Sequence, residues 1–249
     1  MQLRRLHPDP AETVDASEAY ALPTDGTRHL RVNMVSSADG AAAVHGRVGA
    51  LSGAADQELL NLLRALCDVL LVGAGTVRAE GYGPIELPDE WQRRRVVHGQ
   101  LTTPRLAILT RRIDVDLASP VFTEATQKPL LITTELAPVD RRRAAEVVAE
   151  VVVAGERRVA LPTAFDALAE RGLPRILSEG GPHVLAEMFT HDLVDELCLA
   201  VAPVVTCGEE PRITAGPPLP TPVGLGLAHV LEKDEFLFLR YNRRRGGTG

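Results

Sequence analysis

The chain has 249 residues, 45% of them hydrophobic, which is enough apolar material for a sizeable buried core. Its net charge of −6, with both signs interspersed, argues against nonspecific binding to nucleic acid or an anionic membrane, so we expect a small-molecule partner. The three cysteines lack the spacing of a disulfide framework or a zinc site, which favours a reducing cytoplasm. We find no export signal and no apolar run long enough to span a membrane, so neither is expected.

The pattern along the chain predicts strands that alternate with helices. Residues 1–28 are polar and interrupted by proline, and we expect an irregular N-terminal arm there. A strand is predicted at 30–37 and a helix at 54–67, where leucines recur at helical spacing. Further strands are predicted at 68–73, 105–110, 129–133, 150–154 and 175–179, with helices at 137–149, 161–172 and 182–192. Such alternation is typical of a mostly parallel sheet.

The C-terminal part follows a different pattern. Residues 194–205, 224–233 and 235–243 are strand-like and have no helix between them, which indicates antiparallel strands at the edge of the sheet. The sequence therefore predicts an α/β fold with a mostly parallel central sheet and an antiparallel C-terminal edge. We expect one domain over 29–243 and a flexible tail over 244–249.

The stretch "RILSEGGPHVLAEMF", residues 175–189, is the strongest candidate for a binding site. An apolar strand ends at Glu179, two glycines follow, and Pro182 suits the first position of a helix. The free N–H groups in the first helical turn at His183 and Val184 would favour a phosphate. A sharp turn without a ligand is the alternative, but a carboxylate ending a buried strand needs a partner.

Two further strand ends carry candidate residues. Gly75 and Thr76 follow the strand at 68–73, and this Gly-x-Gly stretch fits a ligand loop and a tight turn equally well. Thr110, at the end of the strand at 105–110, with Arg111 or Arg112 after it, offers the groups that grip a ribose 2′-phosphate. A solvated basic turn is the alternative there. The histidines lack the spacing of a metal site, so we expect no metal.

Four motifs in this order resemble the pyrimidine reductase family of riboflavin biosynthesis: "MVSSADGAAAVHGRVGALSG", "LLRALCDVLLVGAGTVRAEGYGP", "RILSEGGPHVLAEMF" and "VDELCLAVAPVV". That family is the reductase domain of the bifunctional riboflavin deaminase–reductase. The resemblance implies a dihydrofolate-reductase-like three-layer sandwich and a homodimer, with the C-terminal strands as its interface. It also implies an NADPH-dependent enzyme that reduces the ribosylamino group of a 5-amino-6-(5-phosphoribosylamino)uracil-type substrate to a ribitylamino group.

The resemblance also implies roles for single residues. Thr76 and Glu80 would line the cofactor, Thr110 would lie near its 2′-phosphate, and Gly181 with the residues after it would hold the pyrophosphate. Arg64 and Glu179 would hold the substrate, and Asp39 and Glu179 are the candidate proton donors, with water as an equal alternative. The full expected cofactor set is Ser37, Gly75, Thr76, Glu80, Thr110, Arg111, Gly180, Gly181, Pro182, His183 and Val184.

The chain departs from the family pattern mainly in the motifs expected to meet the substrate. Ala41 stands where the family has a cation, and Glu80-Gly81-Tyr82 replaces an Asp-Asp-Pro motif. Two alternatives therefore stay open. One is an NADPH reductase of another heteroaromatic substrate such as dihydrofolate, and the other is an NADPH-binding module without catalytic activity.

Overall fold

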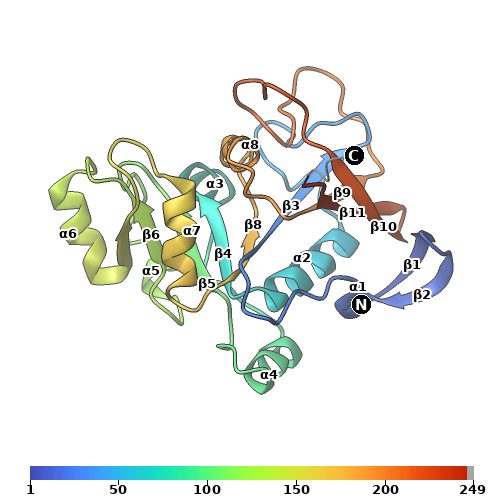
Figure 1. Cartoon of the computed structure of the whole chain (residues 1–249), viewed down its shortest axis with the longest axis horizontal. Coiled ribbons are helices and arrows are strands. Elements are labelled where there is room, and N and C mark those ends of the chain that lie inside the picture. The colour runs from blue at the N-terminus through green and yellow to red at the C-terminus, as the bar shows by residue number, and fades with distance from the viewer. Residues whose placement is uncertain (246–249) are drawn as a thin grey trace. The chain divides into compact units, whose positions relative to one another are not determined.

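The structure, a computed structural model, describes residues 1–245, and Figure 1 labels its helices and strands. The described residues belong to two compact units. The first unit contains Met1–Leu22, His29–Leu63 and the described residues from Pro182 on, and the second contains Pro23–Arg28 and Arg64–Gly181. Neither unit is a continuous stretch of sequence, so composition could not mark the division. The prediction of one domain over 29–243 stays a prediction, and the predicted flexible tail lies from residue 246 on outside the described residues.

The second unit is built on a parallel sheet in the strand order β8-β4-β5-β6-β7. Its strands are β4 (Val69–Gly73), β5 (Arg105–Leu109), β6 (Leu130–Thr133), β7 (Glu150–Val153) and β8 (Arg175–Ser178). Its helices are α3 (Ala74–Glu80), α4 (Asp89–Val97), α5 (Pro120–Thr123), α6 (Val139–Val148) and α7 (Leu161–Ala169). Every residue of β4 is buried, as expected for a central strand that is covered on both faces. The carboxyl ends of β8, β4 and β5 are therefore neighbours, and the candidate residues follow these ends.

The first unit combines one parallel strand pair with antiparallel strands. Its strands are β1 (Gln2–His7), β2 (Ala11–Asp15), β3 (His29–Ser37), β9 (Glu196–Ala202), β10 (Leu225–Lys233) and β11 (Phe236–Arg243), and its helices are α1 (Ala16–Ala19) and α8 (Pro182–Thr190). β3 pairs with β9 in parallel, and β9, β11, β10, β1 and β2 follow as antiparallel neighbours. Helix α2 (Ala54–Leu66) begins in this unit. The predicted α/β class, with mostly parallel strands and antiparallel C-terminal strands, is confirmed.

The prediction of an irregular arm over residues 1–28 is wrong for residues 2–19. They form β1, β2 and α1, and β1 pairs with β10 through Arg4 and Glu232. β1 is mostly exposed apart from the buried Leu3, and β2 has exposed and half-buried residues only, so both lack the apolar alternation that marks a strand in sequence. Their pairing depends on a strand more than 200 positions later, which local patterns do not reveal.

A buried ionic cluster fixes the register of β3 against β9 in the first unit. Glu196 is fully buried, and its carboxylate pairs with Arg31 at 2.5 Å and with Arg240 at 2.8 Å. Burial raises the pKa of Glu196, but the charge of Arg31 and the neighbouring donors outweigh it, so the pKa is held well below its usual range. Because a buried charge is stable only with partners, this cluster specifies which residues of the two strands lie side by side.

Candidate functional site

The glycine pair predicted to bind phosphate forms a turn that lies on the end of β4. The N–H of Gly73 donates to the carbonyl of Gly180 at 2.9 Å, and the N–H of Glu179 donates to Leu71 at 3.2 Å. Gly180 has a φ of 87°, a left-handed value that favours glycine, and the peptide between Gly180 and Gly181 is cis. Helix α8 begins at Pro182, directly after the turn, as the sequence predicts.

Gly181 lies so close to Thr76 that a side chain would not fit without movement. A Cβ atom added to Gly181 would lie 2.9 Å from the Thr76 hydroxyl oxygen. On the same segment, a Cβ at Gly75 would meet nothing within 4 Å, so the backbone there is bare on its outer side. The structure thus brings together the Gly-Gly turn and the Gly-x-Gly stretch, and it leaves main-chain groups accessible beside both.

Arg64 and Glu179, both predicted to hold the substrate, form a bidentate ion pair in the second unit. Nε and Nη2 of Arg64 each donate to one Glu179 oxygen at 2.7 Å. The Glu179 side chain is 7% exposed and that of Arg64 is 21% exposed. Burial disfavours the charged guanidinium, but the hydrogen bonds and charge of Glu179 outweigh this effect and raise the pKa of Arg64. The two hydrogen bonds therefore fix the orientation of the Arg64 guanidinium against Glu179.

Tyr82 is the third member of this cluster, and the sequence analysis did not identify it. Its hydroxyl donates to Oε2 of Glu179. Burial and the nearby carboxylate both raise the pKa of Tyr82, so the phenol stays protonated and continues to donate. With three donors on its two oxygens, Glu179 is suited to orienting a ligand through Arg64 rather than to releasing a proton.

A pocket of about 220 Å³ opens beside the ion pair, within the second unit. Its walls combine the charged and aromatic side chains of the cluster with apolar residues from the segment after α3. The lining residues are Arg64, Leu70, Glu80, Tyr82, Gly83, Pro84 and Ile85. Glu80, a predicted cofactor residue, is thus placed at the pocket. A concave site that combines apolar residues with a few fixed polar groups is the usual form of a small-molecule site.

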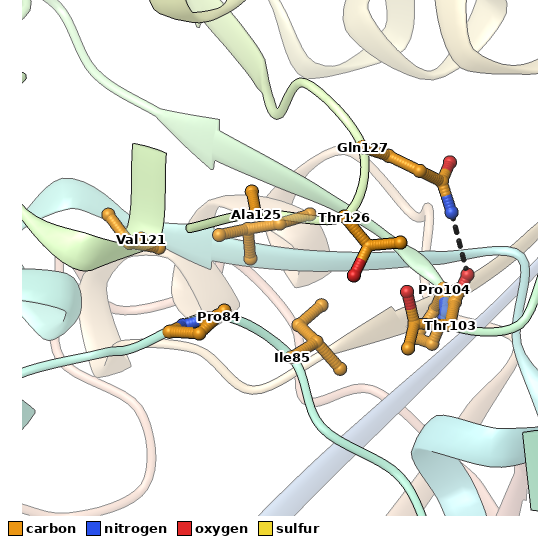
Figure 2. A pocket seen from close by; sticks show the side chains of 9 residues that line it. Pro84, Ile85, Thr103, Pro104, Val121, Ala125, Thr126 and Gln127 are labelled. Carbon is orange, nitrogen blue, oxygen red and sulfur yellow. Dashed lines mark hydrogen bonds between the residues drawn. The ribbon is translucent and has the colours of Figure 1, made fainter. Parts of the chain in front are cut away.

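Pro84 and Ile85 also border a second, much smaller cavity, shown in Figure 2. It holds about 20 Å³, which is room for about one water molecule. Figure 2 shows Gln127 donating to the carbonyl of Thr103, and the two groups are 3.1 Å apart. This cavity is too small for an organic ligand, so the larger pocket is the candidate site.

Thr110 and Arg111 lie just past the carboxyl end of β5, as predicted. Thr110 is 3% exposed, and its hydroxyl donates to Oδ1 of Asp114 at 3.0 Å. The Arg111 side chain is exposed, whereas its carbonyl accepts a hydrogen bond from the Thr134 hydroxyl at 3.1 Å. The geometry therefore places a buried hydroxyl and an accessible guanidinium at the same strand end.

Ser37 and Asp39 belong to the first unit, where they close the loop after β3. The Ser37 hydroxyl donates to Oδ1 of Asp39 at 2.5 Å, and the N–H of Cys207 donates to Oδ2 at 2.8 Å. The hydrogen bonds from Ser37, then Cys207, lower the pKa of Asp39 to about 2. A carboxyl group with that pKa carries no proton near neutral pH, so the geometry favours a structural role for Asp39 over the predicted proton transfer.

Replacing Asp39 with asparagine should loosen the 204–208 segment, because the Cys207 N–H and the Ser37 hydroxyl would lose a charged acceptor. We expect amide hydrogen exchange in that segment to accelerate by about tenfold. Because its pKa is lowered, the Asp39 carboxylate stabilises this segment fully at any pH above the ordinary pKa of an aspartate. That stabilisation is lost only as the pH falls through about 2. Wild-type exchange should therefore show no step from this group between about pH 4 and pH 9. Unchanged exchange in the variant would contradict this role.

The remaining predicted residues are in the first turn of α8, where His183 is exposed and Val184 is half-buried. Among residues 1–245, no group of three or more His, Cys, Asp or Glu side chains could hold a metal ion. Within the same described range, every helix is too short or too polar to cross a bilayer. Tyr82 could have been suspected because it is one of three tyrosines in a chain with 4% aromatic residues and follows the Gly-x-Gly stretch closely.

Comparison with known proteins shows that this chain is similar to reductases. The RibD C-terminal domain family matches residues 28–237. A 2,5-diamino-6-ribosylamino-4(3H)-pyrimidinone 5′-phosphate reductase of Methanothermobacter thermautotrophicus is 30% identical over 191 residues, 74% of this chain and 82% of that protein. The reductase of the same name from Archaeoglobus fulgidus is 28% identical over 183 residues, 73% of this chain and 83% of that protein.

Among solved structures, a pyrimidine reductase-like protein from Corynebacterium diphtheriae superposes with a TM-score of 0.82 and 30% identity. The superposition covers 92% of this chain and 98% of that one. The range that matches the family model, 28–237, contains every candidate residue described above.

Proposed function

This chain belongs to the RibD C-terminal domain family, and from that premise we propose that it is an NADPH-dependent oxidoreductase of riboflavin biosynthesis. It reduces the ribosylamino group of a phosphorylated aminopyrimidine to a ribitylamino group. The observation that carries the proposal is the Arg64–Glu179 pair, ordered by Tyr82 at the wall of a pocket of about 220 Å³. The relatives' names favour this reaction over dihydrofolate reduction and over cofactor binding without turnover.

The cofactor would be held by main-chain groups of the glycine stretches and by side chains at the end of β5. The bare backbone at Gly75 leaves room for a pyrophosphate, and the close approach of Gly181 to the Thr76 hydroxyl fixes the Gly-Gly turn beside it. Helix α8 begins at Pro182, and the N–H groups of its first turn at His183 and Val184 favour an anion. Thr110 and Arg111 offer a hydroxyl and a guanidinium for a 2′-phosphate. When bound, the nicotinamide supplies a hydride.

The substrate's chemistry requires mainly orientation from the protein. A ribosylamine can open to an imine at C1′, and reduction adds a hydride to that carbon and a proton to the nitrogen. Arg64, fixed by two bonds to Glu179, presents a cation that orients the polar substrate in the pocket. Because three donors occupy the Glu179 oxygens, and hydrogen bonds from Ser37 and Cys207 lower the pKa of Asp39, we propose that water delivers the proton.

Two forms of the substrate differ in one ring substituent. The Methanothermobacter and Archaeoglobus relatives are named for a 2,5-diamino-pyrimidinone, whereas the motifs of this chain led us to predict the uracil form. We propose the diamino compound as the preferred substrate, since both names agree, and the uracil as the second candidate. The difference concerns an amino or an oxo group at position 2 of the ring, which a wall of the pocket would have to distinguish.

Steady-state assays of the purified chain test the proposal. NADPH consumption is followed by absorbance with each of the two pyrimidine phosphates and with dihydrofolate, and mass spectrometry identifies the product. We expect a ribitylamino product from at least one pyrimidine and none from dihydrofolate. NADPH oxidation with dihydrofolate alone would replace the proposal with the alternative reductase. NADPH binding without oxidation of any substrate would leave a silent binding module.

We also infer a cytoplasmic homodimer that associates through the C-terminal strands. The three free cysteines support a reducing compartment. Leu227 of β10 and Leu237 of β11 support the interface, because they are 40% and 37% exposed on neighbouring antiparallel strands. Sedimentation velocity should give a dimer for the full chain, and a shift toward monomer when both leucines are replaced by serine. A monomeric wild-type chain would remove this inference.

A further inference from the structure

We propose that Ile85 is a movable wall of the substrate pocket, and that its side chain retreats into the small cavity behind it when the pyrimidine ring enters. The inference rests on the proposed function and identifies a residue that fits the pocket to its ligand. Pro84 and Ile85 line both the pocket of about 220 Å³ and the cavity of about 20 Å³. The two linings have these residues in common, so their segment forms a partition between the two spaces.

Packing rather than hydrogen bonding holds this partition in place. In the part of the chain that the structure describes, residues 83–86 neither donate nor accept a hydrogen bond. The fixed points lie on either side of them. The Tyr82 N–H donates to the carbonyl of Val77 at 3.2 Å, and the carbonyl of the buried Leu87 accepts a hydrogen bond from Nε2 of Gln92 at 2.8 Å. A segment that is tied only at its two ends can shift between them at low cost.

The cavity behind Ile85 is suited to an aliphatic side chain. Figure 2 shows Ile85 among the residues that line it. Leu106 and Val121 line the same space and are buried, so this side of the partition belongs to the core. Protein interiors are close-packed, and a void with apolar lining is therefore uncommon. Beside a side chain that packing alone holds, such a void gives that side chain room to move.

On the pocket side, Ile85 is the part of the wall that can yield. Arg64 and Tyr82 are both tied to Glu179 by hydrogen bonds. Leu70 is fully buried within β4 and is held by the sheet. Ile85 is only half-buried and has no such restraint. The pocket can therefore change its volume at Ile85 while the groups that orient the substrate stay in place.

Methyl NMR of the full chain follows this movement directly, because the sequence contains only six isoleucines. The pyrimidine phosphate is titrated in the presence of NADP⁺, which has no hydride to transfer, so the ligand binds without turnover. The δ1-methyl signal of Ile85 is identified by its loss in Ile85→Val. We expect that signal to shift as the ligand saturates the chain, and the signal of Ile113, which lines neither space, to stay in place.

Filling the cavity from its other side separates retreat of Ile85 from simple contact with the ligand. Val121→Ile adds one carbon to a residue that lines the cavity but not the pocket. It should raise the Kd of the pyrimidine phosphate by about five- to tenfold, measured by calorimetry with NADP⁺ present. Adding Ile85→Val to this variant restores the space, so most of the affinity should return. Ala125→Val fills the same cavity from a less buried residue, in case Val121→Ile does not fold.

Val152→Ile is the matched control, since it makes the same change at a buried residue of β7 that lines neither space. It should leave the Kd unchanged. An Ile85 signal that stays in place at saturation, or wild-type Kd values in both cavity-filling variants, would overturn the inference and leave the proposed function intact. Weaker binding without recovery in the double variant would show ordinary overpacking and would also overturn it. A wild-type chain that neither binds nor reduces the pyrimidine phosphate would overturn the proposed function as well.

Discussion

Replacing Glu179 with glutamine should lower kcat/KM for the pyrimidine phosphate by about 100-fold, or roughly 2.7 kcal/mol in transition-state stabilisation. The carboxylate holds Arg64 through two bonds of 2.7 Å and also accepts the Tyr82 hydroxyl. The oxygen of the glutamine amide can still accept hydrogen bonds. Its nitrogen is a donor only, so it cannot accept the second hydrogen bond from the guanidinium. Arg64 then loses its fixed orientation, whereas the Kd for NADPH should stay within about a factor of two.

The chain contains a matched control for this substitution. Asp68 also forms a buried bidentate pair, with Arg175, and its side chain is 10% exposed against 7% for Glu179. This pair lies at the amino end of β8, away from the carboxyl ends where the candidate residues gather. Asp68→Asn should therefore lower the unfolding free energy by about 3 kcal/mol and leave kcat/KM unchanged.

Tyr82→Phe separates positioning from structure. It removes the third bond to Glu179 and keeps the ring, so we expect kcat to fall by about tenfold with little change in melting temperature. A double variant with Glu179→Gln should lose less than the product of the single effects, because both changes act on the same carboxylate. Wild-type kcat/KM in Glu179→Gln would remove the ion pair from the active site.

The parallel strands could be predicted from sequence because a buried strand is a continuous apolar run within its own few residues. β4 and β6 are runs of buried, mostly apolar residues, and such runs are visible without knowing their partners. Helix α4 was not predicted because it has no apolar stripe. Its position depends instead on Arg95, which donates to the carbonyls of Ala65 and Cys67 near the end of α2. Polar contacts of that kind leave no periodic pattern.

The candidate site was predictable residue by residue but not as an arrangement. Glu179 was singled out because a carboxylate after a buried strand needs a partner, and the partner is Arg64, 115 positions away. Tyr82 was missed because its contact depends on how α3 ends. Gly81 adopts a φ of 63° as the C-cap, which reverses the chain and brings the tyrosine back to Glu179. A backbone reversal of this kind sets a contact that residue spacing does not reveal.

Replacing Gly181 with aspartate should abolish measurable NADPH binding, with a loss of at least about 100-fold in affinity. A Cβ atom at this position would lie 2.9 Å from the Thr76 hydroxyl, so any side chain presses on the segment proposed to meet the pyrophosphate. The added carboxylate also places a negative charge where an anion is proposed to bind. The φ of Gly181 is not in the left-handed region, so φ alone does not exclude a side chain at this position.

Two further variants separate the steric effect from the charge. Gly181→Ala introduces the Cβ alone and should weaken NADPH by about tenfold, and combining it with Thr76→Ala removes the hydroxyl that the Cβ would meet. If the double variant recovers part of the affinity, the contact between these two residues controls access of the anion. The additional loss in Gly181→Asp should shrink at high salt, since it is electrostatic. If Gly181→Asp kept full NADPH affinity, the pyrophosphate would have to bind elsewhere. The Gly-Gly turn would then not be the part of the chain that holds the cofactor.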